Sequence, residues 1–427
     1  MRCSNNPVGA GSEGRQISSA NRPRGRVAIV GAGPAGMAAA LSLHQVGHEV
    51  VIFERHQNVR PLGGGLSLWP APKRAMELMG CDVTDFGAPC LGQFKNAKGR
   101  LRAEAVPPEH VMGEYRACFF GLLRPELYER LMDALPPGIL RSGQRVTSIE
   151  HDRESVKVHV EGEIHEFDLL VGADGIMSVV RELSWGDSPI REHNLHVIVG
   201  HSLDPNLGIE RGYSLIHHDR DTQASWTSIR LRGVDGFQWW VVQRHSAKHQ
   251  FDDDPVATAM AAARNFDPAL TRLIETSDPS KVVRWQIRDR KPLDQLTRGR
   301  VVLTGDAAHP VSPYAAYGAG MAVEDGYFLG RSLAGVDLGD FDALRSALTT
   351  YEGPRREHTA RQVQAAFILG QVFHRLPRPL AWVRDLVLDH TPLLQKYWAE
   401  SIPGDIHRQL TAIETAEHSL KLMPGAG

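Results

Sequence analysis

Apolar residues near the start of the chain form two short runs separated by a helically spaced stretch. Arg26–Val30 is a continuous apolar run that ends at a glycine, which predicts a buried parallel strand. Pro34–Val46 carries apolar residues at helical spacing and is closed by Gly47, and Glu49–Phe53 has the pattern of a second strand. These residues therefore predict a strand–helix–strand unit at the front of the fold.

Loop, helix and strand patterns alternate up to about residue 190. Pro61–Leu68 contains three consecutive glycines, a composition that predicts a mobile loop. We expect helices over Pro72–Gly80 and Arg124–Leu135, and short strands over Val146–Ile149, Val156–Val160 and Ile164–Val171.

The region from Ile190 to Gln286 differs from what precedes it, because it is rich in Trp, His, Arg and Thr. Apolar and polar residues alternate in Ala224–Leu231 and Phe237–Gln243, which is the period of half-buried strands. We therefore expect a mostly antiparallel sheet, and hence a second domain, in this region.

The buried-strand pattern returns at Arg300–Leu303, and a helix is expected from Gly318 to about Leu333. Three more helices are expected over Phe341–Tyr351, Pro354–Phe373 and Leu380–Leu388. The predicted fold class is α/β: a Rossmann-like, mostly parallel domain with an inserted antiparallel-sheet domain and C-terminal helices. The expected boundaries are a disordered tail over 1–24, the Rossmann-like domain over 25–189 and 287–340, the sheet domain over 190–286, and the helical region over 341–427.

The composition narrows the classes of function. A formal net charge of -2 on 427 residues, with 42% hydrophobic and 23% charged residues, gives no indication of nucleic-acid binding. The four cysteines form no CxxC pair, and the histidines are scattered rather than grouped as metal ligands. No stretch has the character of a secretory signal or a membrane span. We therefore expect a cytoplasmic protein without a metal site or stable membrane insertion.

The first chemical signal is VAIVGAGPAGMAAA, residues Val27–Ala40. Gly31, Gly33 and Gly36 form a G-x-G-x-x-G pattern between a predicted strand and a predicted helix, the context of a dinucleotide-binding turn. The first glycine permits the tight turn, the second lets backbone approach a pyrophosphate, and the third lets helix and strand pack. Glu54 ends the second strand, where a carboxylate accepts hydrogen bonds from ribose hydroxyls. The pattern predicts dinucleotide binding.

Two further segments favour FAD as the bound dinucleotide, and no second G-x-G-x-x-G occurs at a strand–helix junction. One is Asp168–Arg181, DLLVGADGIMSVVR. The other is Arg300–Pro310, RVVLTGDAAHP, followed by Pro313 and by Gly318–Asp325, GAGMAVED. Together with the glycine motif, and in this order, these segments resemble group A flavoprotein monooxygenases of the para-hydroxybenzoate and salicylate hydroxylase type. The resemblance covers about residues Arg26–Arg331.

The resemblance implies roles for the matching residues. Glu54 and Arg55 would hold the adenosine end of FAD, and Asp174 would lie by the pyrophosphate. Asp306 would bind the ribityl chain, and Pro313 would lie beside the isoalloxazine and the substrate. The implied cofactor-binding set is Gly31, Gly33, Ala35, Gly36, Glu54, Arg55, Gly65, Arg124, Asp174, Asp306, Gly318 and Ala319.

The activity that the resemblance implies is hydroxylation of a small aromatic or heteroaromatic substrate. NADH or NADPH would bind transiently and reduce FAD, and oxygen transfer would proceed through a flavin C4a-hydroperoxide. The helix predicted to begin at Gly318 would direct its N-terminus toward the pyrimidine end of the flavin. The implied partners are the aromatic substrate and O2, and a homodimer is the assembly to test.

The sheet domain supplies candidates for the substrate chemistry. A phenolic substrate benefits from deprotonation, so Tyr213, His217 and His218 are candidate bases, and the candidate catalytic set also includes Pro313. Arg230 or Arg232 is a candidate partner for a substrate carboxylate. The alternative at each position is a residue of the core or of the solvated face.

Three positions in the last motif leave alternatives open. We expect His309 to satisfy local backbone groups rather than to act in catalysis. The family commonly has G-Q-G where this chain has Ala316-Tyr317-Gly318, and Tyr314 and Tyr317 either line the substrate pocket or only pack.

Two other functions are compatible with the same motifs. The first is a flavoprotein reductase or dehydrogenase that transfers hydride without productive oxygen transfer, and the second is a non-enzymatic, escort-like relative of the fold. The helices beyond residue 341 are expected to cap the substrate domain or to form a dimer face.

Overall fold

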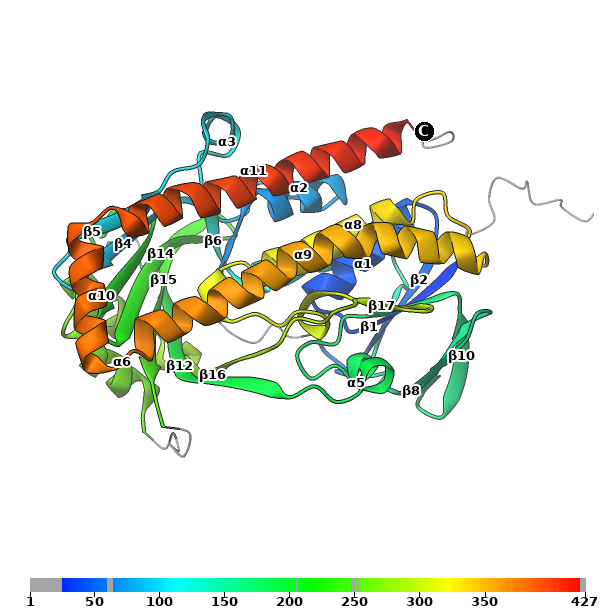
Figure 1. Cartoon of the computed structure of the whole chain (residues 1–427), viewed down its shortest axis with the longest axis horizontal. Helices are drawn as coiled ribbons and strands as arrows, with labels where there is room; N and C mark the ends of the chain where they lie inside the picture. Colours follow the sequence, from blue (N-terminus) through cyan, green and yellow to red (C-terminus); the bar gives the residue numbers. More distant parts are fainter. Residues whose placement is uncertain (1–24, 60–63, 205, 247–250, 252, 423–427) are drawn as a thin grey trace, which may run out of the picture.

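The computed structural model describes residues 25–59, 64–204, 206–246, 251 and 253–422. The tail expected over 1–24 and part of the glycine-rich segment Pro61–Leu68 lie outside the described residues. Two long helices, α9 (Phe341–His374) and α11 (Leu393–Lys421), run along the length of the molecule beside the sheets (Figure 1).

A mostly parallel sheet surrounds β1, whose apolar side chains are buried on both faces, as the unbroken apolar run predicted. Helices α1 (Pro34–Gln45) and α8 (Gly318–Ser332) cover one face, and a small antiparallel sheet with α5 (Val179–Trp185) covers the other. The strand order is β17 (Thr297–Arg298), β18 (Val301–Leu303), β11 (Leu169–Gly172), β1 (Arg26–Val30), β2 (Glu49–Glu54) and β7 (Leu140–Ser142), with only the β17–β18 pair antiparallel.

Helices α1 and α8 pack very closely because small residues meet at their crossing. A Cβ atom on Gly326 would lie 2.3 Å from the Ala39 backbone nitrogen, and one on Gly330 would lie 2.1 Å from the Ser42 hydroxyl oxygen. No larger residue fits at either glycine unless the helices separate. This contact fixes α8, whose N-terminus faces the cavity described below, against the helix that follows the glycine turn.

The small sheet corrects one strand prediction. Ile164–Val171 is not one strand: β10 (Glu163–Phe167) pairs with β9 (Val156–Val160), whereas β11 joins the parallel sheet. The change occurs at Asp168, whose N–H donates to the carbonyl of Arg26 in β1 at 2.9 Å. The third strand of the small sheet is β8 (Val146–His151).

A large, mostly antiparallel sheet forms the second layer, and it includes strands from residues 65–123 that the sequence pattern did not assign to it. The pairs β13–β4 and β14–β6 are parallel. The order is β16 (Val283–Arg290), β12 (Ile190–Ser202), β15 (Val234–Arg244), β14 (Thr222–Leu231), β13 (Tyr213–Asp219), β4 (Ala88–Asn96), β6 (Phe119–Leu123) and β3 (Gly65–Leu68), with β5 (Leu101–Ala105) paired to β4.

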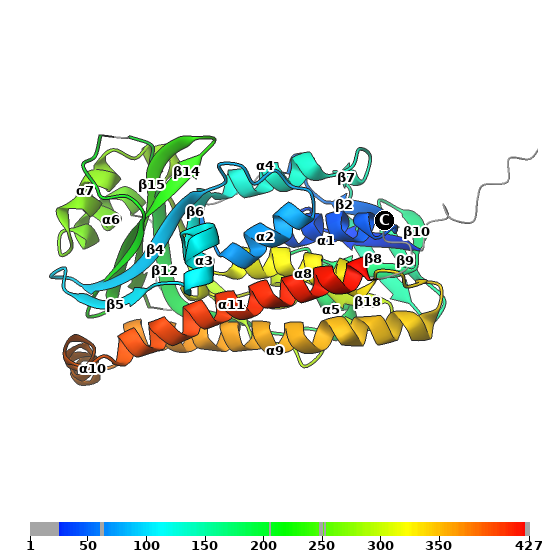
Figure 2. The ribbon, with the colours of Figure 1, turned by 90° about the horizontal axis from the view of Figure 1, so that it is seen from above.

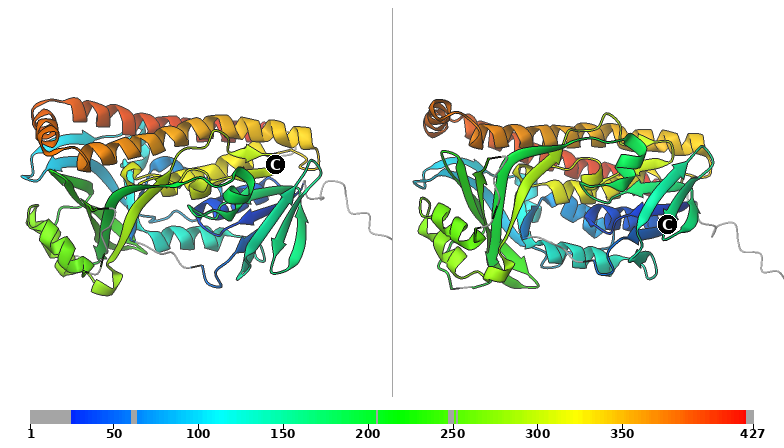
Figure 3. Two further views of the ribbon diagram at one scale, coloured as in Figure 1. Left: turned by 60° about the horizontal axis from the view of Figure 1, so that its bottom comes forward. Right: turned by 90° about the horizontal axis from the view of Figure 1, so that it is seen from below.

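The two faces of the large sheet have different neighbours. One face packs against α6 (Pro255–Ala263) and α7 (Pro268–Glu275) and buries Trp226, Trp239 and Leu270 in an apolar cluster. Figures 2 and 3 show these two helices on the far side of the sheet from α9 and α11. The opposite face of the sheet is therefore available to line an internal site.

The C-terminal helices also differ from the prediction. The expected break at Pro354 is absent, because α9 is one helix of 34 residues with Pro354 inside it. A proline inside a helix costs about 3 kcal/mol. Arg355, the next residue, donates to Glu324, Asp325 and the carbonyl of Met321 on α8, and these contacts hold the helix across the proline. The chain then forms α10 (Arg378–His390) before α11 returns antiparallel to α9 (Figure 1).

Candidate active site

The glycine turn after β1 has little room for side chains. Gly31 has φ +103°, and a Cβ there would lie 2.5 Å from the carbonyl oxygen of Ala173. A Cβ on Gly36 would lie 2.0 Å from the carbonyl oxygen of Gly31, so the turn itself requires both glycines. At Gly33, by contrast, the nearest atom is the Tyr128 hydroxyl oxygen at 3.9 Å. The fold does not require glycine at that position, and the open space lies on the cavity side.

Glu54 is buried at the end of β2 and holds this turn. Its Oε2 accepts from the N–H of Ala32 at 2.9 Å, and its Oε1 accepts from the N–H of His56 at 2.8 Å. Arg55 is exposed, and its Nε donates to the ring of His56 at 3.1 Å. The structure therefore gives the Glu54 carboxylate a role in positioning the backbone that would receive a dinucleotide.

The carboxylate of Asp174 accepts hydrogen bonds from backbone N–H groups of this chain. Its carboxylate accepts from the N–H groups of Val179 at 2.7 Å and Val180 at 3.3 Å, and also from the Ser178 hydroxyl. Burial raises the pKa of Asp174, and these hydrogen bonds oppose that shift. Its neighbours Ala173 and Gly175 line the cavity, whereas the carboxylate caps the start of α5.

A cavity of about 710 Å³ lies where the glycine turn, the large sheet and the C-terminal helices meet. Within the part of the chain that the structure describes, it brings together residues that lie far apart in sequence. Of the sequence-predicted set, its lining includes Gly33, Ala35, Gly65, Arg124, Asp306, Pro313, Gly318 and Ala319.

Asp306 and Arg124 carry charge at this end of the cavity. Desolvation by the surrounding protein raises the pKa of Asp306, and the charges of His309 and Arg124 lower it. Among the described residues the Asp306 carboxylate has no hydrogen-bond partner, although its side chain is open to the cavity. Such an unpaired acceptor fits a ligand that presents hydroxyl groups, as a ribityl chain does.

The N-terminus of α8 supplies donors beside Asp306. No side chain caps this helix, and Gly318 and Ala319 in its first turn line the cavity. Uncapped N–H groups and the helix dipole favour a group of negative charge. The open turn at Gly33, the unpaired carboxylate and this helix end together fit an FAD molecule.

The loop before α8 is fixed by one buried carboxylate. Asp325 accepts from the N–H of Gly305 at 2.8 Å, from Nε2 of His309 at 2.5 Å and from Nε of Arg355 at 2.9 Å. Burial raises the pKa of Asp325, but His309 and Arg355 outweigh burial and lower it to about 2. The ring of His309 thus contacts a carboxylate, not the backbone groups that we expected.

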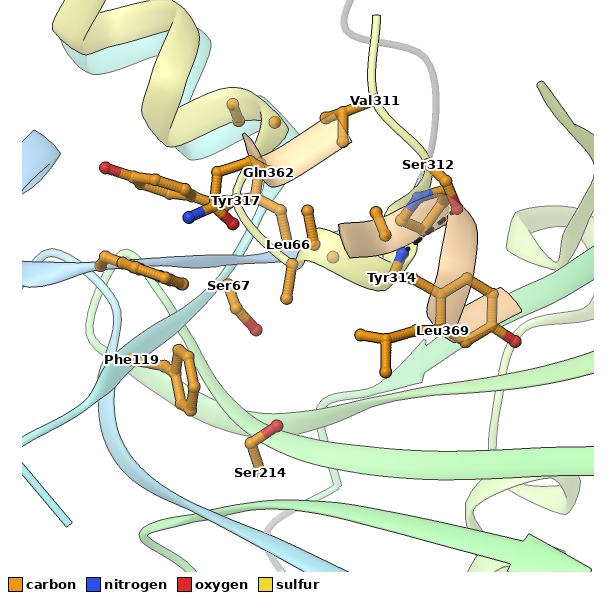
Figure 4. A pocket seen from close by; sticks show the side chains of 18 of the residues that line it. Leu66, Ser67, Phe119, Ser214, Val311, Ser312, Tyr314, Tyr317, Gln362 and Leu369 are labelled. Atoms are coloured by element: carbon orange, nitrogen blue, oxygen red, sulfur yellow. Dashed lines mark hydrogen bonds between the residues drawn. The ribbon is translucent and has the colours of Figure 1, made fainter. Parts of the chain in front are cut away.

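The face of the large sheet that lines the cavity carries aromatic and neutral polar side chains. The hydroxyls of Ser214 and Thr227 bond to each other at 2.9 Å. Figure 4 shows Ser67, Phe119 and Ser214 at the cavity, with Tyr314 and Leu369 facing them from the other walls. The aromatic lining of this region is Trp69, Phe94, Phe119, Trp240, Trp285, Tyr314, Tyr317, Phe373, Tyr397 and Trp398.

Tyr213 and His217 lie on the opposite face of the sheet, because successive side chains of β13 alternate and it is Ser214 and Ile216 that line the cavity. His217 is 2% exposed and stacks on Trp226 at 4.8 Å between ring centroids. Burial lowers the pKa of His217 to about 4. Their packing against α6 and α7 argues against the base role that we expected for either residue.

The candidate arginines of the sheet domain also lie outside the cavity lining. Nε of Arg230 donates to Asp235 at 2.8 Å, and Arg232 pairs with Glu129 at 2.6 Å. Both pairs are at the surface, so they do not provide the carboxylate site that we expected.

Tyr314 and Tyr317 both line the cavity, which resolves the alternatives left open by the sequence. The ring of Tyr317 stacks on Trp69 at 3.9 Å, and its hydroxyl donates to Glu324, whose pKa is raised to about 7 by burial. The hydroxyl of Tyr314 contacts Nε2 of His374 at the end of α9. The sequence signal was the pair of aromatics where the family commonly has G-Q-G.

The C-terminal helices were expected to cap the substrate domain or to form a dimer face, but the sequence pattern did not identify which residues of α9 and α11 line the cavity. Their contributions recur along one face of each helix: Arg361, Gln362, Ala365, Ala366, Leu369 and Phe373 from α9, and Tyr397, Trp398, Ser401, Ile402, Asp405 and Arg408 from α11. Only knowledge of which helix face meets the sheet distinguishes these residues from an ordinary amphipathic pattern.

The described residues were also compared with the requirements of a metal site and of a membrane span. They contain no group of three or more His, Cys, Asp or Glu side chains arranged to hold a metal ion. None of the helices within the described ranges has the length and apolar character that crossing a membrane requires.

Comparison with known proteins defines the class. The sequence pattern of the family described as FAD binding domain matches residues 24–366, so this chain belongs to that family. Its class is that of the group A flavoprotein monooxygenases, enzymes that hydroxylate aromatic compounds, and the predictions of an enzyme and of FAD are confirmed.

Individual relatives are more distant. The chain is 27% identical to 6-hydroxynicotinate 3-monooxygenase of Bordetella bronchiseptica over 79% of this chain and 89% of the relative. It is 28% identical to 3-hydroxybenzoate 6-hydroxylase of Klebsiella oxytoca over 84% and 92%. The structure of Klebsiella pneumoniae HpxO complexed with FAD and uric acid superposes with a TM-score of 0.77 at 22% identity, covering 91% of this chain and 97% of that one. That likeness confirms the fold.

Proposed function

We propose that this chain hydroxylates an electron-rich aromatic or heteroaromatic ring held between the large sheet and the loop that precedes α8, using NADH or NADPH and O2. The observation that carries the proposal is one continuous cavity. Its lining joins Gly33, Asp306 and Gly318, which fit FAD, to an aromatic wall, and the whole cavity measures about 710 Å³. A ring held against that wall would therefore lie in the same cavity as the cofactor.

The chain's residues would hold the cofactor by the groups described above. Asp306 would accept from the ribityl hydroxyls, the first turn of α8 would donate to the pyrimidine end, and Arg124 would provide positive charge. Bound FAD supplies the redox chemistry and the reaction with O2. Pro313, which lines the cavity one loop before α8, would lie against the substrate side of the ring system.

The sheet wall of the cavity favours the neutral part of a substrate, a ring with polar substituents. Ser214, Thr227 and Gln238 offer neutral donors and acceptors at fixed positions on the sheet, and these would orient a ring hydroxyl or a ring nitrogen. Trp240 and Trp285 offer flat apolar surfaces for stacking. Burial among these side chains excludes water from the reacting carbon.

The names of the relatives agree with such a substrate. They act on 6-hydroxynicotinate and 3-hydroxybenzoate, and a third relative, from Klebsiella pneumoniae, is an FAD-dependent urate hydroxylase at 27% identity. Each name describes a ring with an oxygen substituent that raises its electron density. We propose the same general class here and assign no single member of it.

The test is aerobic consumption of NADH and NADPH by the purified, FAD-loaded protein in the presence of phenols, aromatic acids and N-heteroaromatics, with peroxide measured in parallel. We expect at least one compound to accelerate consumption with little peroxide and to yield a product heavier by one oxygen atom. Turnover of an added electron acceptor under nitrogen, with no aromatic product in air, would instead establish a reductase.

We also propose a cytoplasmic location and a homodimer. The described cysteines Cys81, Cys90 and Cys118 are free, buried thiols, which is the usage of a reducing compartment. A second copy would pack on the exposed apolar side chains of α10, among them Leu380 and Trp382. Light scattering on the purified protein tests the assembly, and cell fractionation tests the location.

A further inference from the structure

The part of the cavity that lies between α9 and α11 carries positive charge that the proposed function does not use. Arg361 on α9 and Arg408 on α11 both line the cavity, and their side chains are 46% and 55% exposed. The cavity thus reaches solvent between the two helices. Because α9 and α11 run antiparallel (Figures 1 and 2), their charged residues come together at one end and Leu369 and Trp398 at the other.

One carboxylate lies between the two arginines. Asp405 Oδ1 accepts from Nη2 of Arg361 at 3.3 Å and also contacts Nη2 of Arg408, while its Oδ2 accepts from the buried amide of Gln362 at 2.8 Å. Both carboxylate oxygens are therefore occupied within the chain. The cluster of two guanidinium groups and one carboxylate keeps a net charge of about +1 at the cavity mouth.

The remaining donors of the arginines are available to a ligand. A guanidinium carries five N–H donors, and within the described ranges neither Nε of Arg361 nor Nε and Nη1 of Arg408 has a hydrogen-bond partner. Glu357 lies 4.0 Å from Nη1 of Arg361, but its side chain is 81% exposed and directed to solvent, so it neutralises little.

The rest of the lining offers no competing site for an anion. Among the residues that line the cavity, the other charged side chains are Arg124 and Asp306, both at the end that fits FAD. The sheet wall is aromatic or neutral, and an unpaired carboxylate buried there would lose its hydration without compensation. A substrate that carries an anion would therefore place it at Arg361 and Arg408, with its ring toward the sheet.

We propose that Arg361 and Arg408 form an anion subsite where the cavity lies between α9 and α11, which binds a carboxylate carried by the aromatic substrate. The subsite rests on the proposed function, because it selects among aromatic substrates. From Arg361 to Phe373 the lining of α9 extends about 18 Å at 1.5 Å per residue, enough for a ring and a separated acid group. Because both arginines are partly exposed, they would attract an anionic substrate from solution and orient it in the cavity.

The experiment titrates matched acid and amide pairs into the FAD-loaded protein and follows the flavin absorbance. The probes are 3-hydroxybenzoate, 6-hydroxynicotinate and 3-hydroxyphenylacetate, each with its neutral amide. In the wild-type protein we expect at least one acid to bind more than tenfold tighter than its amide, and the difference to shrink as salt is added. In the variant carrying both Arg361→Gln and Arg408→Gln, the affinity for the acid should fall at least tenfold, and the affinity for the amide should fall less than twofold.

Two further variants separate recognition from structure. Asp405→Asn removes the internal negative charge, so it should raise the affinity for the acid about threefold. If the cluster had only a structural role, the same change would lower that affinity. Arg345→Gln alters an exposed arginine on α9 outside the cavity lining and should change nothing.

Each other result overturns the subsite. Equal affinity for acid and amide in the wild type would do so, while acceleration of NAD(P)H consumption by neutral phenols would leave the proposed function standing. Equal losses for acid and amide in the double variant would show a structural role. A raised KM for NADH or NADPH with unchanged acid binding would assign the arginines to the phosphates of the nicotinamide cofactor. Failure of every aromatic compound to accelerate consumption would refute the proposed function itself.

Discussion

The two ends of the cavity are built in different ways. At the cofactor end the chain excludes side chains: Gly31 and Gly36 have no room for a Cβ, and α8 presents bare N–H groups at Gly318. At the substrate end the lining consists of side chains from the large sheet and from α9 and α11. Backbone groups recognise what all members of a class share, whereas side chains can change without altering the backbone. Substitutions at Gly31 or Gly36 should therefore destabilise the fold, whereas substitutions at the substrate end should change substrate affinity and leave the fold intact.

The largest expected effect separates two glycines of one turn. Gly36→Ala places a methyl group 2.0 Å from the carbonyl oxygen of Gly31 and should lower the free energy of unfolding by about 3 kcal/mol even without FAD. Gly33→Ala meets nothing closer than 3.9 Å and should leave the apoprotein as stable as wild type while reducing FAD binding. Thermal unfolding of the two apoproteins, with flavin content measured beside it, makes the comparison. Equal stability of both variants would refute this division of roles.

The unpaired carboxylate gives the next effect. Asp306→Asn keeps the shape but removes the charged acceptor, and a hydrogen bond to a charged group is worth about 1.5–3 kcal/mol. FAD affinity should therefore fall roughly 10- to 100-fold. Fluorescence titration of the apoprotein with FAD measures it, and Asp174→Asn is the matched control. Because Asp174 caps α5 instead of facing the cavity, its variant should lose stability more than flavin affinity.

His217 tests whether the far face of the sheet belongs to the site. Its pKa is lowered to about 4 by burial, so between pH 6.5 and 4 the unfolded chain binds a proton that the folded chain does not. Stability should therefore fall as the pH drops through this window, by about 2 kcal/mol at pH 5 from this one residue. In His217→Gln the fall should be smaller, and turnover at pH 7.5 should equal that of wild type. A large loss of turnover in a stable variant would return His217 to the catalytic residues.

The smallest expected effect concerns the polar pair on the cavity face. Ser214→Ala removes a hydroxyl that bonds to Thr227 and faces the substrate region, and it should raise KM less than tenfold with the fold intact. Steady-state kinetics with the substrate found in the screen would show it. The informative contrast is with Tyr213→Phe on the other face of the same strand, for which we expect no change in KM.

Local sequence patterns were sufficient to predict the strand, glycine turn and helix at the cofactor end of the cavity. The run Arg26–Val30, the glycine turn and the helix after it are contiguous in sequence, so their geometry follows from short-range chemistry. The motifs also named Asp306 and Gly318, and both residues line the cavity in the structure. The pattern did not predict that Glu54 and Asp174 accept hydrogen bonds from backbone N–H groups of this chain, because those bonds depend on the three-dimensional positions of Ala32 and Val179.

The substrate end depends on register and on long-range packing. Tyr213 and His217 are separated from Ser214 and Ile216 only by the alternation of β13, and nothing local states which face meets the cavity. Pro354 predicted a break, but ion pairs to α8 hold α9 continuous. Arg361 and Arg408 appear solvent-facing by pattern and become neighbours only through the antiparallel return of α11.

The large sheet precedes α9 and α11 in chain order, and this order has a consequence for synthesis. Every residue that fits FAD lies before residue 320, whereas one wall of the substrate cavity is translated after residue 360. During translation, the aromatic face that includes Trp240 and Trp285 emerges long before the helices that cover it. The nascent chain thus exposes an apolar sheet face to solvent until α9 and α11 dock on it. Chaperones that bind exposed aromatic surface are expected to meet this protein at that stage.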